Sequence, residues 1–416
     1  MKRGLGLVLV LAGGAAPAAA EVDLFSGDQL RGFIDFRAGA ADGEDSWLDD
    51  GFGKTRFGGN NGDWAGGLTG QAALLWTPHF TWELDGHLHL QAEPHQDHAV
   101  DVVEAYLTYR APPRENWEFG ARAGLMFPPI SLEHDGPAWS TTRTLTPSAI
   151  NTWVGEEVPV IGIEGTARRR FGAQEFGATL GAFGWNDTSG TLLSYRGWAL
   201  HDVLSTAFGD FALPQRSPAW HALKASQAPS TAPTRELDDQ VGYYARLEWK
   251  PVGPLTLDVF HYDNEGDRLS NDDGQWSWET RFTNLGMRWA LTPDTTLLAQ
   301  GMMGQTIYGR RMASGYWVDM DFASAYVLMS HETGSGGVYA GRFDYFETTD
   351  RSNFGLDNND ETGWVATLAY RRPLNERATL VLEGLHVESD RAARADVGLE
   401  PEQAQTTLQT ALQLAF

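Results

Sequence analysis

Residues 80–92 read FTWELDGHLHLQA and carry the pattern on which the fold prediction rests. Every even-numbered position holds an aromatic or aliphatic side chain or glycine, whereas the odd-numbered positions hold Thr, Glu, Asp, two His and Gln. An alternation of period two predicts a β-strand with one apolar and one polar face. The apolar face would contact a core in a soluble sandwich, or lipid in a membrane barrel whose polar face lines a wet interior. One strand does not distinguish these folds, so the whole series has to be considered.

The same alternation recurs along the chain and predicts sixteen strands, an even number as expected for a single-chain bacterial barrel. In the strand expected at 277–289 the apolar positions change parity near Asn284, which suggests a β-bulge. Because that strand and the two after it have weaker patterns, fourteen and eighteen strands are the alternatives. The expected strands cover 30–39, 64–76, 80–92, 101–110, 117–126, 160–170, 176–185, 241–250, 255–262, 277–289, 295–306, 317–329, 338–347, 362–371, 379–387 and 407–416.

The connections between these strands alternate between short turns and long loops, and this favours a membrane barrel over a sandwich. In an even-stranded barrel both chain ends then lie at the short-turn end. Aromatic residues gather at that end on the expected outward faces, as in the aromatic girdle of membrane barrels. The long loops are 40–63, 127–159, 186–240, 263–276 and 348–361, and the aromatic residues are Trp76, Phe80, Tyr109, Trp117, Trp249, Trp289, Tyr370 and Phe416.

The composition excludes several other classes of protein. The 416 residues include 55 acidic and 31 basic side chains, and the formal charge of -24 argues against binding to nucleic acid. The mean hydropathy of -0.34 and the lack of a long apolar run in the body of the chain argue against a helical membrane protein. There is no Cys, so neither a disulfide framework nor a thiolate metal site is expected.

The first twenty residues have the three parts of a secretory signal peptide. Lys2 and Arg3 precede a short apolar core at 5–11, and Ala18 to Ala20 form an A-x-A cleavage site before Glu21. The apolar core is too short for a transmembrane helix. We therefore expect an exported protein with a signal peptide at 1–20 and a mature domain at 21–416.

With its signal peptide, alternating strands and terminal Phe416, the chain resembles the bacterial outer-membrane porins. The resemblance implies an all-β, transmembrane, antiparallel up-and-down barrel of about sixteen strands with an inward-folded third loop. It also implies a homotrimer in the outer membrane, contacts with lipid and lipopolysaccharide, and recognition of Phe416 by the outer-membrane assembly machinery. The implied function is a water-filled channel for passive diffusion of small hydrophilic solutes, without a cofactor. No catalytic residue is expected.

The loop at 127–159 is the candidate constriction loop, because in such porins the third loop narrows the barrel. The loop is rich in acids, and the expected inward positions of nearby strands carry arginines. An acidic loop opposite a basic wall would place a transverse field across the pore. The alternative is that each charge hydrates the interior or pairs locally. The candidate pore-lining residues are Arg122, Glu133, Asp135, Arg143, Glu156, Glu157, Arg168, Arg170, Arg246, Arg288 and Arg342.

A narrower resemblance concerns substrate selectivity. Residues 122–133, RAGLMFPPISLE, are similar to the segment entering the third loop of the phosphate-selective (O/P-type) porins. That family also has a lysine cluster, whereas this chain has only Lys2, Lys54, Lys224 and Lys250. The resemblance therefore supports a channel, with a phosphate-, anion- or sugar-selective channel as the alternative.

Three further features have competing interpretations. His87 and His89 lie two residues apart on one face, which suits a metal site or, more simply, a polar interior. The acidic loops could bind divalent cations that bridge to lipopolysaccharide, or be solvated. The long loop at 186–240 is expected to be extracellular, and it could either contain a short helix near 201–208 or latch onto a neighbouring subunit. The chain contains no G-x-S-x-G, H-E-x-x-H or P-loop motif, so a hydrolase ranks below a channel, as does a receptor or adhesin.

Overall fold

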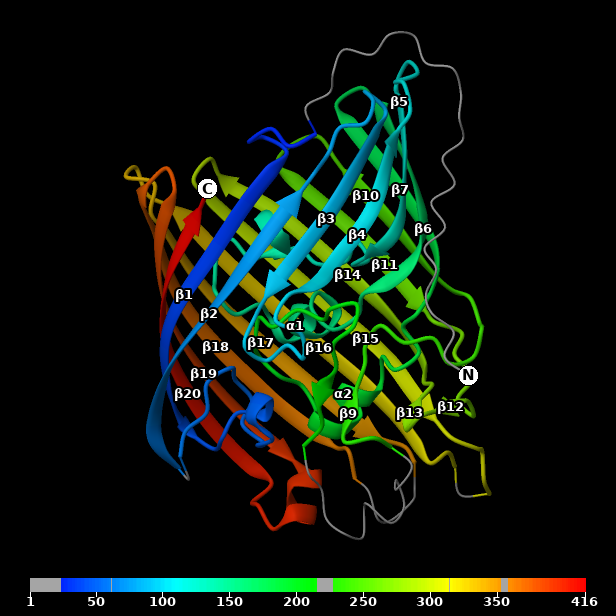
Figure 1. The fold of residues 1–416 in the computed structure, drawn as a ribbon, viewed down its shortest axis with the longest axis vertical. Coiled ribbons are helices and arrows are strands. Elements are labelled where there is room, and N and C mark those ends of the chain that lie inside the picture. The colour runs from blue at the N-terminus through cyan, green and yellow to red at the C-terminus, as the bar shows by residue number, and fades with distance from the viewer. Residues whose placement is uncertain (1–23, 61, 215–226, 314, 353–357) are drawn as a thin grey trace.

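The computed structural model describes residues 24–60, 62–214, 227–313, 315–352 and 358–416. The signal peptide expected at 1–20 lies outside the described residues. Sixteen strands in the described part of the chain form one closed antiparallel barrel (Figure 1). Each of the sixteen predicted strands is present. They are β1 (Leu30–Gly43), β2 (Gly62–Trp76), β3 (Leu84–Ala92), β4 (Asp101–Arg110), β5 (Trp117–Met126), β6 (Val160–Phe171), β7 (Gln174–Gly184), β10 (Gly242–Lys250), β11 (Leu255–Asp263), β14 (Glu279–Thr292), β15 (Thr295–Tyr308), β16 (Val318–Glu332), β17 (Val338–Asp350), β18 (Glu361–Asn375), β19 (Ala378–Arg391) and β20 (Glu402–Ala415).

Short elements occupy the connections at the long-loop end. Two small sheets lie outside the barrel ladder, formed by β8 with β9 and by β12 with β13. None of the described helices is long and apolar enough to cross a membrane. The short elements are η1 (Trp47–Asp49), η2 (Pro137–Trp139), α1 (Ala149–Val154), α2 (Thr191–Arg196), β8 (Phe211–Ala212), β9 (Ser230–Thr231), β12 (Asn271–Asp272), β13 (Gln275–Trp276) and η3 (Ala392–Val397).

The barrel closes between its first and last strands. β1 pairs with β20 from Phe33 opposite Ala415 to Ala41 opposite Thr407. At the short-turn end, the Gly32 and Phe416 backbones exchange two hydrogen bonds of 2.8 and 3.0 Å. The sheet therefore has no free edge, because every barrel strand has a neighbour on both sides.

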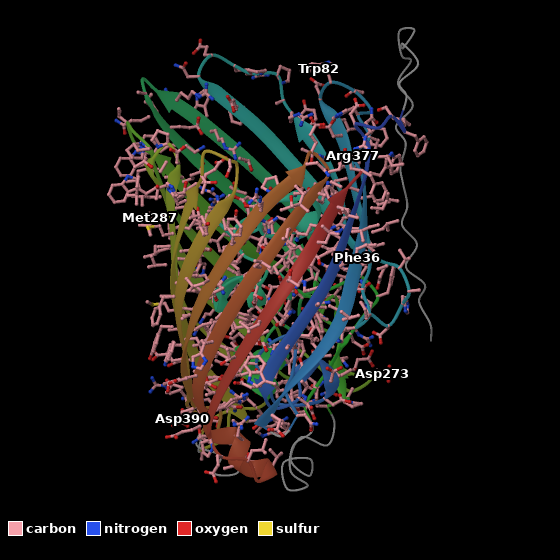
Figure 2. The ribbon with its side chains drawn as sticks, turned by 90° about the vertical axis from the view of Figure 1, so that its left-hand side faces the viewer. Phe36, Trp82, Asp273, Met287, Arg377 and Asp390 are labelled. Carbon is pink, nitrogen blue, oxygen red and sulfur yellow. The ribbon has the colours of Figure 1, made fainter. Side chains whose placement is uncertain are left out.

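The alternation in sequence becomes an alternation of outward and inward side chains. On β3, Asp85 and His89 are buried inside, whereas outward side chains such as Phe36 on β1 are exposed. Figure 2 shows Trp82 and Arg377 at the short-turn end, and Asp273 and Asp390 at the opposite end. The predicted girdle aromatics lie at strand ends near the short turns, although Phe80 precedes β3 and Phe416 follows β20.

The bulge expected near Asn284 is not present, and this prediction was wrong. β14 keeps its register with β15 from Glu279 to Ala290, and the shift comes only between Ala290 and Thr292. The change of apolar parity has a different cause. Phe282 faces inward and is almost fully buried, with its ring centroid 5.5 Å from that of Trp153 in the third long loop. An apolar residue is favourable inside the barrel here because a loop packs against it.

Candidate functional site in the barrel interior

The loop at 127–159 folds into the barrel and packs against its inner wall. Its short helix α1 is fully buried and contacts β16 and β17 (Figure 1). Trp153 lies edge-on to Phe322 with ring centroids 4.9 Å apart. Trp139 stacks on Phe127 at 5.3 Å and donates a hydrogen bond to the Gly155 carbonyl. Large aromatic contacts of this kind, rather than loop backbone alone, fix the position of the loop.

Glu133 joins the N-terminus of α1 to the barrel wall. Its carboxylate accepts hydrogen bonds from the Ser148 backbone N–H at 3.0 Å and from the Asn151 side chain at 2.6 Å. The same carboxylate lies 3.2 Å from the Arg342 guanidinium, which also donates to Asp344 and to the Thr146 carbonyl. A helix N-terminus favours a negative charge, and a buried charge needs a partner. Glu133 and Arg342 therefore hold the loop against β17.

The other charges of this loop also pair at close range. Asp135 lies 2.8 Å from Arg143 within the loop and 3.4 Å from Arg288 on β14. Glu157 accepts two hydrogen bonds from Arg196, at 2.7 and 2.9 Å, in a forked arrangement. The acidic loop and the basic wall thus meet directly at Glu133–Arg342 and Asp135–Arg288. Whether a transverse field acts on solutes remains a prediction.

Glu156 lies between two imidazoles, 3.4 Å from His134 and 3.3 Å from Nδ1 of His201. The Val203 backbone N–H donates to that same Nδ1, and Nε2 of His201 lies 2.7 Å from Glu157. His201 therefore carries its proton on Nε2, and Nδ1 is an acceptor. Burial, helped by the negative charges of Asp202 and Glu157, raises the pKa of Glu156 well above its usual range. The Glu156 oxygen that faces His201 is buried and accepts or donates no hydrogen bond among the described residues, so this carboxyl group is held by burial beside the two rings.

The remaining wall arginines lie on the opposite side, on β5, β6 and β10. Arg122 donates to Glu164 at 2.6 Å and lies 5.2 Å from the centre of the Tyr106 ring. Arg246 lies between Glu248 at 3.2 Å and Asp258 at 3.3 Å. Arg170 is near the short turn and pairs with Glu118 and Glu175. Arg168 faces inward between these pairs and has no ion-pair partner among the described residues.

Two hollows lie in the interior on the short-turn side of the third loop. One has a volume of about 610 Å³, and Arg110, Glu118, Arg122, Arg168 and Arg246 contribute to its lining. The other has a volume of about 290 Å³. Its lining includes Arg37 and Asp35 from β1, Trp139 from the loop, and Arg371 and Arg377 from around β18. Both hollows therefore bring charged side chains from distant strands around a solute-sized space.

No family model matches this chain, and no curated protein is similar to it in sequence. Solved structures are similar in fold. The anion-selective porin from Comamonas acidovorans has a TM-score of 0.52 at 13% identity, over 93% of this chain and 98% of that one. The outer membrane channel DcaP of Acinetobacter baumannii has a TM-score of 0.52 at 11% identity, over 93% of this chain and 96% of that one. The trimer form of OmpT, an outer membrane protein of Vibrio cholerae, has a TM-score of 0.50 at 8% identity, over 93% of this chain and 99% of that one. The fold is that of a porin.

Within this porin fold, the first part of the loop at 186–240 does not stay outside the barrel. All six residues of α2 are buried, and so is Trp198, whose ring lies 6.0 Å from that of Trp153 and 6.2 Å from that of Phe346. The loop expected to be purely extracellular therefore contributes a second inward-folded segment. The signal in the sequence is the set of apolar side chains between Leu192 and Leu204, which a solvated loop does not need.

A third inward segment follows β1 and binds the segment that follows α2. Lys54 donates to the Trp198 carbonyl at 2.9 Å and forms a buried ion pair with Glu361, which also pairs with Arg391 at 3.2 Å. Asp202 bridges Arg37 at 2.7 Å and Arg56 at 2.8 Å. The long-loop half of the barrel interior is consequently filled by interlocking charges, whereas the hollows open toward the short-turn half.

The two histidines expected as a weak metal site have different surroundings. His87 stacks on Tyr106 at 4.6 Å and lies 3.5 Å from Glu104. His89 is fully buried, and neither of its ring nitrogens has a hydrogen-bond partner among the described residues. Three potential ligand side chains converge elsewhere, at the long-loop end.

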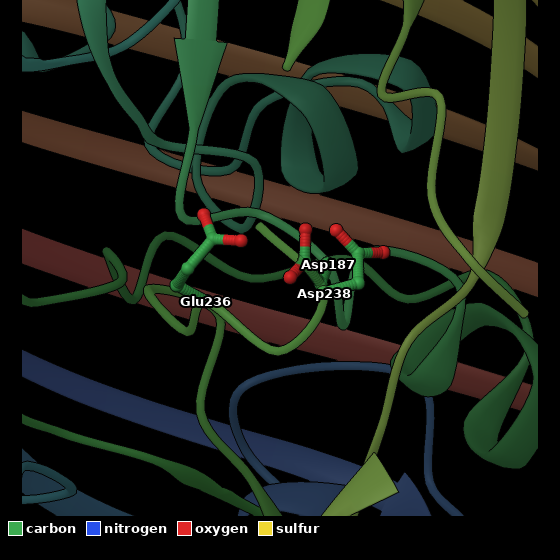
Figure 3. Close-up of side chains that lie close together, drawn as sticks. All are labelled: Asp187, Glu236 and Asp238. Carbon is green, nitrogen blue, oxygen red and sulfur yellow. The ribbon is translucent and has the colours of Figure 1, made fainter. Parts of the chain in front are cut away.

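That cluster consists of Asp187, Glu236 and Asp238 (Figure 3). Backbone N–H groups already bind these carboxylates, because Leu237 donates to Asp187, Trp185 to Glu236 and Asp267 to Asp238. Burial, with the charges of Asp238 and Glu236, raises the pKa of Asp187 to about 7. The cluster is thus a proton-binding feature of the loop, and no sequence motif pointed to it.

Proposed function

We propose that this protein is an outer-membrane porin that passes small hydrophilic solutes and ions by passive diffusion. One observation carries the proposal: a closed sixteen-stranded barrel has an apolar outer surface and a polar interior that contains two charged hollows. The outward aromatic residues at the short-turn end fit the headgroup region of a bilayer. Residues 1–20 would be the cleaved signal peptide and 21–416 the barrel domain. Diffusion through such a channel needs neither a cofactor nor a catalytic residue.

The proposal also covers assembly. The structurally similar OmpT of Vibrio cholerae has a trimer form, and a homotrimer is proposed here. Phe416, which follows the closing strand, is proposed as the signal read by the outer-membrane assembly machinery. Native mass spectrometry of the detergent-purified protein tests the oligomer, and a monomer at all detergent concentrations would contradict it.

A second candidate, an anion-preferring channel, is favoured by the distribution of unpaired charge. Arg168 lines one hollow, and Arg371, Arg377 and Glu376 line the other. None of these four forms an ion pair among the residues that the structure describes, and three arginines against one glutamate leave a net positive charge. The acids of the third loop, by contrast, each lie within ion-pair distance of an arginine or a histidine. Positive charge without a nearby partner attracts anions into a wet pore.

Single-channel current in a planar bilayer with a salt gradient tests both candidates. Stepwise ohmic conductance is expected, with a reversal potential that indicates anion preference. Block by phosphate, pyrophosphate or a sugar would identify a substrate-selective channel. If folded protein, recognised by its shift in gel mobility on heating, gives no conductance, the porin proposal fails and a receptor, adhesin or hydrolase is favoured.

A further inference from the structure

Arg169 points away from the barrel interior, although it lies in a run of three arginines on β6. Successive side chains of this strand alternate between its two faces, so Arg169 shares the outward face with Ala167 and Phe171. Arg168 and Arg170 face inward. Its register partners are Trp117 on β5 and Phe176 on β7. Arg169 forms no ion pair with any described residue, and a lipid-facing charge is unfavourable unless it lies near the interface or finds a partner.

Aromatic rings surround the Arg169 guanidinium. Its central carbon lies 4.9 Å from the centre of the Trp117 ring and 4.2 Å from that of Phe171. Phe171 meets Phe176 edge-on at 5.8 Å, and Phe176 stacks on Trp249 at 6.2 Å. Contacts with ring faces stabilise the cation and hold it in place, but they do not use its N–H donors. The donors remain available for an acceptor that comes from outside the protein.

An apolar groove of about 630 Å³ begins beside Arg169 and continues over the outer wall. Ala167 and Ala178 lie opposite each other on β6 and β7, and their small side chains form the floor of the groove. Larger side chains rise on the β10 and β11 side. These are Leu247, Trp249, Leu257 and Val259. The groove thus combines one fixed positive charge with a long apolar surface.

We propose that Arg169 and this groove bind one phospholipid of the leaflet at the short-turn end. The phosphate accepts hydrogen bonds from the guanidinium, and an acyl chain lies over Ala167 and Ala178. Arg169 is three residues before Gly172 in the short turn, which is the depth at which headgroups meet a girdle. A second copy of the chain would have to supply a carboxylate there, whereas a phospholipid supplies its phosphate and apolar chain together. The inference relies on the proposed membrane location but not on conduction.

The test is native mass spectrometry of the detergent-purified protein with palmitoyl-oleoyl phosphatidylglycerol added in steps. We expect one tightly retained lipid on the wild-type chain and about tenfold weaker retention by Arg169→Gln, since one charge-assisted contact is lost. Arg372→Gln is the matched control, because Arg372 is also outward and exposed near the short turns, on β18, but contacts no aromatic ring among the described residues. Equal retention by the wild type and both variants would overturn the proposal.

A second variant tests the groove separately from the charge. Ala178→Leu fills the floor while Arg169 stays in place, and it is expected to weaken binding of the same lipid. If Arg169→Gln changes the oligomer mass and leaves lipid retention unchanged, the face belongs to a second copy and the lipid site is rejected. Conductance measured on the same samples keeps the two proposals apart, because loss of the lipid should leave the channel current unchanged.

Discussion

At the residue scale, the wall arginines divide into those that hold the structure together and those that are free to meet a solute. Arg342 and Arg288 bind carboxylates or carbonyls of the third loop, and Arg122 and Arg246 pair with acids of the wall. Arg168 lines a hollow and has no such partner among the described residues. Solute selectivity should therefore depend on Arg168 more than on the paired arginines.

We predict that Arg168→Glu shifts the reversal potential of the channel toward cations, because it replaces the unpaired positive charge of the larger hollow with a negative one. The measurement is the zero-current potential in a salt gradient. Arg372→Glu makes the same change of charge on the outer surface and should leave the potential unaltered. An unaltered potential in Arg168→Glu would remove this residue from the conduction path.

Asp187 makes the stability of its loop, at the long-loop end, depend on pH. Because burial raises its pKa from 3.8 to about 7, the folded loop favours the protonated acid. The contribution to stability is complete below the unfolded pKa of 3.8 and is lost as the pH rises through about 7. We predict that the hydrogen-exchange protection of 231–240, corrected for the intrinsic pH dependence of amide exchange, falls as the pH rises through this range, and that the corrected protection is independent of pH in Asp187→Asn.

A second variant checks the cause of that shift. Glu236→Gln removes one of the neighbouring charges that raise the pKa of Asp187 and should move the midpoint to lower pH. If the exchange rate has the same pH dependence in Asp187→Asn as in the wild type, another group controls the loop.

At the element scale, three inward-folded segments meet at Trp198, which contacts Trp153 of the third loop and Lys54 of the segment after β1. Trp153 belongs to α1 and Trp198 lies just beyond α2, and both rings contact Phe322 on β16. The third segment reaches Trp198 through Lys54. Loosening any one of them should affect the others, because contacting residues are energetically coupled.

We predict that Trp153→Ala destabilises the third loop by about 3–5 kcal/mol and raises single-channel conductance, since a large buried side chain is removed. Trp198→Ala should act in the same direction on the second segment. Trp364→Ala, which removes an outward tryptophan of β18, is the control and should leave conductance unchanged. If both interior variants are folded and conduct like the wild type, the inward segments do not limit the current.

At the scale of the whole molecule, closure of the barrel rests on the pairing of β1 with β20, whose residues are almost 400 positions apart in sequence. Phe416 lies at the end of this seam, exposed and outside the ladder except for its backbone bonds to Gly32. Its ring covers Gly32, where any added Cβ would overlap the aromatic carbons. The residue thus contributes little to the core but occupies a defined place at the seam.

We predict that Phe416→Ala folds in detergent into a barrel of normal heat resistance but reaches the outer membrane in reduced amount. Leu412→Ala is the matched control, since Leu412 lies on the outward face of the same strand. The comparison measures folded protein in outer-membrane fractions against protein refolded in vitro. Equal membrane yields of the two variants would contradict a role for Phe416 in assembly.

The strands and their faces followed from the sequence, because the alternation of side chains along a strand is a local property of the backbone. β4 and β5 were predicted to the residue, and the two faces of β3 were assigned correctly from Leu84 onward. At Asn284 the same reasoning failed. The inward direction of the Phe282 side chain is explained by its contact with Trp153, in a loop that lies far away in sequence. From periodicity alone, an apolar residue at an inward position is interpreted as a bulge. The correct interpretation requires knowing which residue packs against it.

The sequence by itself therefore determined the class of fold, the positions of the sixteen strands and, outside the region of Asn284, the faces of strands such as β3. Only the tertiary structure decided which charges meet. The Glu133–Arg342 and Lys54–Glu361 contacts join residues 209 and 307 positions apart, and the inward folding of 186–206 depends on aromatic contacts with β16 and β17. The physical reason is that strand periodicity needs only neighbours along the chain, whereas burial and ion pairing depend on three-dimensional proximity that no local pattern encodes.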